Sequence, residues 1–335
     1  METSKTLIEV KNVCQEFHLT KGLLQSLRFE KGKLVKEDKV VHAVNDVSFE
    51  IKKGEVFSLV GESGCGKSTT ARTVIRLLEP TSGQVLYKGK DISHLGPNEL
   101  LPYRKSMQMI FQDPYASLNP RQRVADIIME PLLFHGIAKT KEEARERCMS
   151  ILARVGLRPE QAGRYPHQFS GGQRQRIGIA RALAVNPEFI IADEPVSALD
   201  VSIQAQVINL FRRLQKQFNL TYVFISHDLG IIKYISDRIM IMYLGRVMEF
   251  YTSEGIYADP KHPYTQALLS AIPPESPFDK KERLPLTGDI PSPIGDQVGC
   301  PLAGRCPHCT ERCKKEIPKL VDTGDGHMVA CFLYE

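Results

Sequence analysis

A glycine-rich segment at residues 61–68, with the sequence GESGCGKS, constrains the fold of this chain more than any other feature. A turn of this kind aims several backbone N–H groups at one point, while Lys67 adds a mobile cation and Ser68 a hydroxyl that suits Mg²⁺. The apolar run 55–60 before it reads as a buried strand, and 68–78 after it reads as a helix. The segment therefore predicts a polyphosphate site between a strand and a helix of an α/β fold.

A second apolar run, 189–192, ends in the acids Asp193 and Glu194. Phosphate-loop proteins need a strand that ends in Asp, because this carboxylate holds Mg²⁺ beside the hydroxyl of the loop. An Asp-Glu pair is also an ordinary strand terminus, but the phosphate loop upstream favours the metal interpretation. The sequence therefore predicts Mg²⁺ near Ser68 and Asp193.

The segment 169–173, with the sequence FSGGQ, offers a second helix end for an anion. Ser170 is a favourable N-cap for a helix that begins near Gly171, and the glycine pair permits close approach of the backbone to a phosphate. A chain with two such helix ends either binds one phosphate twice or lends the second end to a neighbouring chain.

Strands and helices alternate along two stretches of the chain, which predicts a wound parallel sheet. Strands are expected at 6–10, 44–51, 83–87, 107–111, 188–193, 221–225 and 238–243, and helices at 171–185 and 201–218. Between the two stretches, 121–156 is rich in helix formers and poor in β-branched runs. This composition predicts a small helical subdomain inserted in the core.

Together these segments resemble the motifs of one family, the ATP-binding subunits of ABC transporters, and the resemblance runs through nearly the whole chain. Gln112 in the segment MIFQDP is similar to the family's Q-loop, and residues 170–173 are similar to its signature. Residues 197–200 (SALD) resemble the D-loop, and His227 in FISHD resembles the switch histidine. Phe169 replaces the commoner leucine, which exchanges one apolar residue for another.

The resemblance implies a P-loop ABC ATPase core with an inserted helical subdomain and a small proline- and cysteine-rich C-terminal domain. The core would span 1–259, with the helical subdomain at about 113–169, and the C-terminal domain would span 260–335. Two subunits would pack head to tail, so that each ATP lies between Lys67 of one subunit and the signature of the other.

The resemblance also assigns roles to residues. Glu194 would orient or deprotonate the attacking water, His227 would contact the γ-phosphate, and Gln112 would link the site to the helical subdomain. Mg²⁺ would be held by Ser68, Gln112 and Asp193. The remaining positions implied to bind ATP are Phe17, Ser63, Gly64, Cys65, Gly66, Thr69, Ser170, Gly171, Gly172, Gln173 and Asp200.

Phe17 falls where the family places the aromatic ring that stacks on adenine, although a phenylalanine in an N-terminal strand is more often a core residue. Between Thr20 and Val40 the chain is lysine-rich and longer than in many relatives, which could move the register. This segment most simply forms a solvated hairpin or loop, and contact with membrane headgroups is the alternative.

The residues after Asp259 differ in composition, with nine prolines between 260 and 301. They predict an extended, turn-rich tail. Within it, residues 262–273 (HPYTQALLSAIP) read as a proline-started amphipathic helix that packs on the core. This segment also resembles the tail motif of the oligopeptide and dipeptide importer branch, whose nickel-import relatives share part of it.

Five of the eight cysteines lie in the last 36 residues, namely Cys300, Cys306, Cys309, Cys313 and Cys331. Such a cluster in a cytoplasmic protein more often binds metal than forms disulfides, and the spacing fits zinc and an iron–sulfur cluster equally well. Peptide-importer relatives with a cysteine-rich tail match Cys300, Cys306, Cys313 and Cys331, so the resemblance implies a [4Fe-4S] cluster on these four. Zinc on Cys306 and Cys309, with His308 or His327 in reserve, and free thiols remain open.

Composition agrees with a soluble chain of about two domains, since 42% of the residues are hydrophobic and 25% are charged. A net charge of +5 is too small to demand a nucleic-acid partner. No apolar run approaches the roughly 18 residues that span a bilayer, and residues 1–5 do not open a signal peptide. The chain is expected at the cytoplasmic face of the cell membrane, held there by permease subunits.

The function implied by the resemblance is ATP hydrolysis that drives import of dipeptides or oligopeptides. The partners would be a second ATP-binding subunit, identical or homologous, two transmembrane permease subunits and, indirectly, an extracytoplasmic peptide-binding protein. Nickel or another solute is the alternative cargo. A soluble ABC ATPase that acts on DNA or ribosomes is the alternative class, but such relatives usually carry two cassettes or a long coiled coil, and this chain has one cassette and no heptad run.

Overall fold

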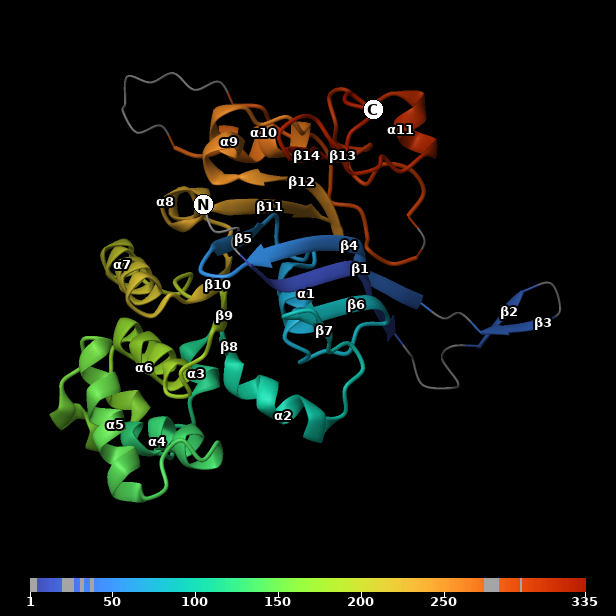
Figure 1. The fold of residues 1–335 in the computed structure, drawn as a ribbon. Coiled ribbons are helices and arrows are strands. Elements are labelled where there is room, and N and C mark those ends of the chain that lie inside the picture. Colours follow the sequence, from blue (N-terminus) through green and yellow to red (C-terminus); the bar gives the residue numbers. More distant parts are fainter. Residues whose placement is uncertain (1–4, 20–26, 31–32, 37–38, 274–282, 296) are drawn as a thin grey trace. The chain divides into compact units, whose positions relative to one another are not determined.

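The computed structural model describes residues 5–19, 27–30, 33–36, 39–273, 283–295 and 297–335. These residues form two compact units (Figure 1). The first unit contains residues 5–6, 51–59 and 95–237, and the second contains the described residues of 7–50, 60–94 and 238–335.

A parallel sheet runs through the first unit in the order β5-β10-β9-β8. Its strands are β5 (Val56–Val60), β8 (Met107–Ile110), β9 (Phe189–Asp193) and β10 (Thr221–Ile225). Every residue of β5, β9 and β10 is buried, as expected when helices cover both faces of a parallel sheet. The strands predicted from these apolar runs are therefore confirmed.

The helices of the first unit include the predicted helical insertion. They are α2 (Pro97–Ser106), α3 (Pro114–Ser117), α4 (Val124–Phe134), α5 (Lys141–Arg154), α6 (Gly171–Leu183), α7 (Val201–Phe218) and α8 (Leu229–Ile235), with 3₁₀ turns η1 (Pro159–Gly163) and η2 (Pro166–Gln168). Helix α4 packs against α5 and α6, and Figure 1 shows these helices gathered in one cluster. The helix formers of 121–156 thus form α4 and α5.

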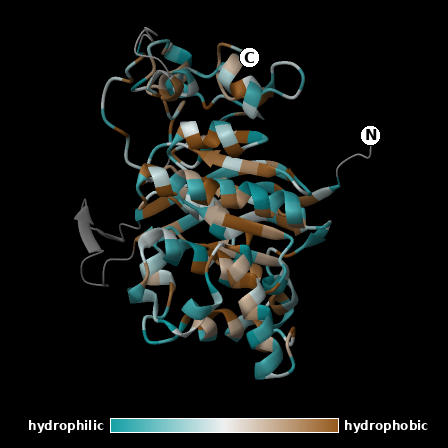
Figure 2. Cartoon of the chain, turned by 90° about the vertical axis from the view of Figure 1, so that its left-hand side faces the viewer, coloured by the Kyte–Doolittle hydropathy of each residue, from teal (hydrophilic) through white to brown (hydrophobic). Residues whose placement is uncertain are grey.

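An aromatic cluster joins α7 to the sheet of the first unit. The Phe211 ring meets Tyr222 at 5.5 Å and Phe224 at 5.6 Å, in both cases edge to face. All three side chains are fully buried. In Figure 2 the strands are coloured mainly hydrophobic, whereas the helices mix hydrophobic and hydrophilic residues.

Besides a short hairpin described below, the second unit contains strands ordered β4-β1-β6-β7 and β13-β14-β12-β11. Their bounds are β1 (Thr6–Leu19), β4 (Lys39–Lys52), β6 (Ser82–Tyr87), β7 (Lys90–Asp91), β11 (Arg238–Tyr243), β12 (Arg246–Thr252), β13 (Val321–Asp322) and β14 (Met328–Val329). The helices are α1 (Lys67–Val74), α9 (Ser253–Ala258), α10 (Pro263–Ser270) and α11 (Glu311–Lys315).

The tail is anchored to the second unit at two places. Helix α10 confirms the predicted proline-started helix, and its Tyr264 is fully buried. Strand β14 pairs with β12 through Glu249 and Val329, so the last residues of the tail extend the β11–β12 sheet.

The sequence predicts a helix over 68–78 after the phosphate loop. Helix α1 is shorter, since it ends at Val74. Arg76 adopts a left-handed backbone with φ of 57°. Its Nε donates to Ile92 O at 2.8 Å from a buried position, which holds the chain in this turn. The helix stops although apolar residues continue.

The lysine-rich segment between 20 and 40 is described only in part. Strands β2 (Leu27–Glu30) and β3 (Lys33–Lys36) pair antiparallel, as in a hairpin. The predictions for the rest of this segment lie outside the described residues.

Among the residues that the structure describes, no helix is both long and apolar enough to cross a membrane.

Candidate nucleotide-binding and cysteine sites

The phosphate loop joins β5 to α1 and requires two of its glycines. Gly61 and Gly66 have φ angles of 153° and 102°. A Cβ on Gly61 would lie 2.2 Å from the carbonyl oxygen of Met242. A Cβ on Gly66 would lie 2.3 Å from the carbonyl oxygen of Ala43. Neighbouring backbone therefore leaves no room for a side chain at either position.

Lys67 is held inside this loop by backbone carbonyls. Its Nζ donates to Gly61 O at 2.8 Å and to Glu62 O at 2.9 Å, and the residue is 5% exposed. Cys65 Sγ lies 3.7 Å from the same nitrogen, and burial raises the pKa of this thiol, so it stays neutral. These neutral partners orient the ammonium without neutralising its charge, which suits a polyphosphate ligand.

The other predicted loop residues lie at the loop tip and on the first turn of α1. Ser63 and Gly64 are exposed, and Ser68 and Thr69 are half-buried. Gly66 is the N-cap, and no described side chain caps this helix end. The first-turn N–H groups therefore have no capping side chain that would compete with a phosphate.

Phe17, the predicted adenine-stacking residue, lies near the end of β1 in the same unit as the loop. Its side chain is 38% exposed, so it is not a core residue. An exposed ring is what stacking on adenine requires.

We expect Gly66→Ala to lower the free energy of unfolding by about 3 kcal/mol, because left-handed backbone strain and a backbone clash add. Gly89→Ala is the matched control, since Gly89 has φ of 76° but open space around the position of a Cβ. The control should lose only about 1 kcal/mol. Urea denaturation of both variants measures the difference, and equal losses would show that the contact with Ala43 is not limiting.

Three predicted catalytic side chains meet at the carboxyl ends of the first unit's strands. Gln112 follows β8, Glu194 follows β9, and His227 follows β10. Gln112 Nε2 donates to Glu194 Oε2 at 2.9 Å, and His227 Nδ1 lies 3.5 Å from the same oxygen. An amide and an imidazole thus converge on one carboxylate oxygen.

Glu194 is placed by an unusual backbone conformation. Its φ is 44°, a left-handed value that is uncommon for a residue with a side chain. Its N–H donates to Ile225 O at 3.0 Å, and its carbonyl accepts from Ser197 Oγ at 3.1 Å. Asp193, the last residue of β9, is 1% exposed. The adjacent acids therefore differ in burial, with Asp193 inside and the Glu194 side chain 19% exposed.

The signature segment forms the helix start that the sequence predicts. Helix α6 begins at Gly171 with Ser170 as N-cap. Ser170 Oγ accepts from Gln173 N at 3.4 Å, and Gln173 Oε1 accepts from Ser170 N at 3.1 Å. This reciprocal capping box fixes the start of α6.

Gly172 has a packing role that the sequence prediction missed. A Cβ there would lie 2.3 Å from Ile203 Cγ2 of α7, so glycine lets the two helices approach. Asp200 caps α7, since its Oδ1 accepts from Ile203 N at 3.0 Å. The hydrogen bond from Ile203 N lowers the pKa of Asp200 most, and the hydrogen bond from the Ser202 hydroxyl lowers it further. Asp200 therefore stays ionised.

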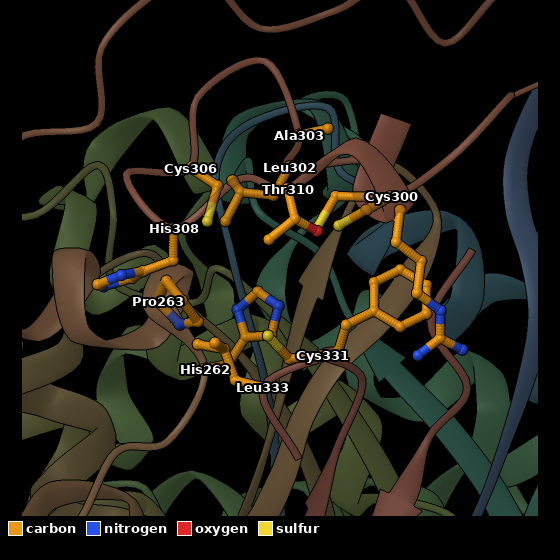
Figure 3. A pocket seen from close by; sticks show the side chains of 13 residues that line it. His262, Pro263, Cys300, Leu302, Ala303, Cys306, His308, Thr310, Cys331 and Leu333 are labelled. Carbon is orange, nitrogen blue, oxygen red and sulfur yellow. The ribbon is translucent and has the colours of Figure 1, made fainter. Parts of the chain in front are cut away.

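A separate cavity in the second unit is lined by cysteines (Figure 3). Its volume is about 170 Å³. Its lining includes Cys300, Cys306, Cys313, Cys331, His262 and His308. All of these thiols are free. The structure therefore brings the four predicted cluster ligands around one cavity.

The electrostatics of these thiols reflect burial and mutual proximity. Burial, together with the neighbouring Cys313, Cys331 and Cys306, raises the pKa of Cys300 to about 11. Burial is also the main cause of the raised pKa of Cys306 and of Cys331. The raised pKa values keep Cys300, Cys306 and Cys331 as neutral thiols.

Two residues of the zinc alternative lie elsewhere. Among the described residues, Cys309 is not part of the cavity lining, and its Sγ contacts Thr310 O at 3.6 Å. His327 is buried, with Nε2 2.6 Å from Glu249 Oε1 and its ring stacked on Tyr251 at 4.3 Å. His327 is therefore engaged in the core and is not among the residues that line the cavity. Within the described ranges, no group of three or more His, Cys, Asp or Glu side chains is arranged to hold a metal ion.

The phosphate loop lies between a buried strand and a helix. Three neighbouring parallel strands are followed by an amide, an acid and an imidazole. Together these features define a nucleotide-hydrolysing protein of the P-loop class.

Comparisons with known proteins give the family. Residues 44–197 match the family model for ABC transporters, and residues 248–313 match the C-terminal region of oligopeptide/dipeptide transporters. The oligopeptide transport ATP-binding protein AppF of Bacillus subtilis is 53% identical and covers 98% of both chains. A putative peptide import ATP-binding protein of Brucella ovis is 54% identical, covering 86% of this chain and 90% of its own.

Among solved structures, the ATP-binding cassette MJ0796, in a dimeric post-hydrolysis state bound to ADP and phosphate, matches with a TM-score of 0.63. It is 30% identical and covers 74% of this chain and 99% of its own. The chain therefore belongs to the ABC transporter family of ATP-binding proteins. The predicted P-loop ABC ATPase fold and the ATPase assignment are confirmed.

Proposed function

We propose that this ATPase powers the import of dipeptides or oligopeptides through a separate membrane permease. The observation that carries the proposal is that the likeness to peptide-transport ATP-binding proteins continues from the core into the tail. The ABC core is common to many transporters, whereas the family model that residues 248–313 match is the C-terminal region of oligopeptide/dipeptide transporters. The boundary between a nucleotide-binding domain at 1–259 and a tail domain at 260–335 is part of this proposal.

The proposed reaction is in-line attack of water on the γ-phosphate of ATP, in which positioning and charge stabilisation do most of the work. Lys67 stabilises negative charge on the phosphate oxygens. Glu194 orients the water and accepts its proton, while Gln112 and His227 fix the position of the carboxylate. Since Gln112 Nε2 donates to Glu194, the amide oxygen of Gln112 is the atom of this side chain that can bind a cation.

Oxygen donors suited to Mg²⁺ are present at the predicted positions. The set is the Ser68 hydroxyl, the Gln112 amide oxygen and the Asp193 carboxylate, which are the hard ligands that Mg²⁺ prefers. When bound, Mg²⁺ would supply positive charge that stabilises the negative charge developing on the phosphate. Asp193 is buried at the end of β9, which agrees with a metal-side role and leaves Glu194 as the base.

The proposed assembly is a head-to-tail dimer of ATP-binding subunits. Each ATP would lie between Lys67 of one subunit and Ser170, Gly171 and Gln173 of the other. The start of α6 at Gly171 supports this, because it is a second helix N-terminus in the chain besides that of α1. Two permease subunits would hold the dimer at the cytoplasmic face of the membrane, and an extracytoplasmic protein would deliver the peptide.

A [4Fe-4S] cluster on Cys300, Cys306, Cys313 and Cys331 is part of the proposal. Four free thiols line one cavity, which supplies the kind and number of donors that such a cluster takes, although the described side chains are not arranged as a metal-binding group. When bound, the cluster would cross-link segments of the tail that are far apart in sequence. We assign it a structural role, because small proline-rich domains often need such a staple.

Transport in proteoliposomes tests the cargo. We expect the full chain, reconstituted with its permease subunits and binding protein, to drive ATP-dependent uptake of labelled dipeptides to pentapeptides. Lys67→Ala should reduce this uptake more than tenfold, because the phosphate loop loses its cation. Uptake of nickel without peptide would contradict the proposed cargo. Stimulation of ATP hydrolysis by DNA or ribosomes would favour the alternative class, a soluble ABC ATPase that acts on these substrates.

A further inference from the structure

Two tail side chains, those of Arg305 and Tyr264, meet at one residue of the phosphate loop, Glu62. Arg305 Nη1 donates to Glu62 Oε2 at 2.7 Å, and Arg305 Nη2 donates to Glu62 Oε1 at 3.1 Å. The Glu62 N–H donates to Tyr264 Oη at 2.9 Å. Arg305 Nη1 also donates to Tyr243 Oη at 3.2 Å. The contacts to Glu62 from Arg305 and Tyr264 come from residues more than 200 positions away in the chain.

The Arg305–Glu62 pair is more than a surface ion pair. Its two hydrogen bonds are parallel, which gives direction as well as attraction. The Arg305 side chain is 10% exposed and that of Glu62 is 27% exposed, so water screens the pair only partly. Tyr243 and Tyr264 beside it are buried, with ring centroids 4.8 Å apart. The buried rings restrict the positions that Arg305 and Glu62 can adopt.

The same loop residue positions the phosphate-binding cation. The carbonyls of Gly61 and Glu62 accept hydrogen bonds from Lys67 Nζ. Glu62 is therefore held by the tail through its side chain and its N–H, and it holds Lys67 through its carbonyl. Movement of Glu62 would move the ammonium that meets the phosphates, and small displacements of such a group strongly affect binding and reaction.

Arg305 is also part of the cysteine cavity's own turn. It directly precedes Cys306, and both residues donate from their N–H groups to Leu302 O, at 2.8 and 2.9 Å. Ala303 N donates to Cys300 O at 3.0 Å, so a tight hydrogen-bonded turn joins two of the four thiols. Cys300 N in turn donates to Cys313 O at 2.7 Å, which connects this turn to the third of the four cysteines. A group that holds these thiols in place would therefore also hold the backbone of Arg305, and with it the direction in which the Arg305 side chain points.

We propose that Arg305 is a positioning residue of the nucleotide site and transmits occupation of the cysteine cavity to the phosphate loop. A group bound by the four thiols holds the turn from Cys300 to Cys306, the turn aims Arg305 at Glu62, and Glu62 holds Lys67 in place for ATP. The inference rests on the proposed ATP and cluster sites. It makes the tail a determinant of ATP affinity in addition to a structural appendage.

Direct binding measurements test this inference without relying on hydrolysis. Calorimetry with the non-hydrolysed analogue AMP-PNP and Mg²⁺ gives Kd for the full chain reconstituted with ferrous iron and sulfide. We expect Arg305→Gln to raise Kd about tenfold, which corresponds to about 1.4 kcal/mol. Arg305→Lys should recover part of the affinity, because it keeps the charge but not the two-pronged geometry. Lys314→Ala is the matched control, since Lys314 pairs with Glu311 in the exposed part of the same tail.

Removal of the bound metal with a chelator tests the transmission step. Metal removal should weaken nucleotide binding by the unaltered chain several-fold, and should have little further effect in Arg305→Gln. Glu62→Gln changes the loop side of the same contact and should behave like Arg305→Gln, and the double variant should be no worse than either single one. The pattern then does not depend on the folding of one variant.

Unchanged Kd in both Arg305→Gln and Glu62→Gln would overturn the positioning role. Metal dependence that persists in Arg305→Gln, or a chain that holds no metal at all, would overturn the transmission. Lys67→Ala separates this result from the proposed function. If Lys67→Ala binds nucleotide as well as the unaltered chain, the proposed nucleotide site itself is wrong, whatever Arg305 does.

Discussion

Glu194→Gln is expected to leave ATP binding intact while slowing hydrolysis by at least about 100-fold, the contribution typical of a general base. The substitution keeps the size of the side chain and its ability to accept a hydrogen bond from Gln112, but it removes the basic carboxylate. ATP would then bind and close the dimer without being consumed. Phosphate release at saturating ATP measures the rate, and size-exclusion chromatography with ATP and Mg²⁺ measures the trapped dimer.

The matched control for this prediction is Glu142→Gln, which removes an exposed carboxylate from the first turn of α5. It should hydrolyse ATP at the rate of the unaltered chain. The left-handed backbone at Glu194 is a separate requirement for the same reaction, because it brings the carboxylate to Gln112 and His227. Retained hydrolysis in Glu194→Gln would remove Glu194 from the role of base and leave its carboxylate with a structural role only.

Elements whose signals are local are predictable from the sequence. Strands β9 and β10 are short apolar runs buried on both faces, a pattern that does not depend on the rest of the fold. The phosphate loop and the start of α6 are equally local, since glycines and a capping serine stand within a few residues of each other. Convergence of Gln112, Glu194 and His227 follows once their strands are parallel neighbours.

Features set by distant contacts are not predictable in this way. Helix α1 stops because Arg76 turns left-handed toward Ile92, although the local sequence favours a longer helix. Gly172 is required by the approach of Ile203 from α7, whereas its sequence context suggested an anion. Arg305 and Glu62 are ordinary charged residues without periodicity, and only the folded chain pairs them. A co-varying pair in an alignment of relatives is the signal that would find this contact.

The cysteines show what the fold adds to spacing. Spacing alone permits zinc on Cys306 and Cys309 as well as a cluster on four thiols. The turn between Cys300 and Cys306 and the hydrogen bond from Cys300 N to Cys313 O bring distant thiols to one cavity. Of the described residues, Cys309 stays outside its lining. The choice among ligand sets thus depends on backbone turns that the spacing does not specify.

Serine at any one of Cys300, Cys306, Cys313 or Cys331 is expected to lower iron and sulfide from about four of each per chain to less than about one. With one thiolate removed, one iron of the cluster would lack a protein ligand, so the cluster would not be retained on the protein. Iron and acid-labile sulfide assays, with absorption near about 400 nm, measure the loss on protein reconstituted without oxygen.

Cys309→Ser is the matched control for this loss, because it removes a thiol of the same segment that does not face the cavity. It should keep the full iron and sulfide content. Loss in Cys309→Ser equal to that in Cys306→Ser would contradict the proposed ligand set. Stoichiometric zinc without sulfide would replace the cluster by a mononuclear site and leave the ATPase assignment unchanged. It would also weaken the resemblance of this tail to the cysteine-rich tails of peptide importers. The measurement of iron, sulfide and zinc therefore also tests whether the tail can be used to identify the transported solute.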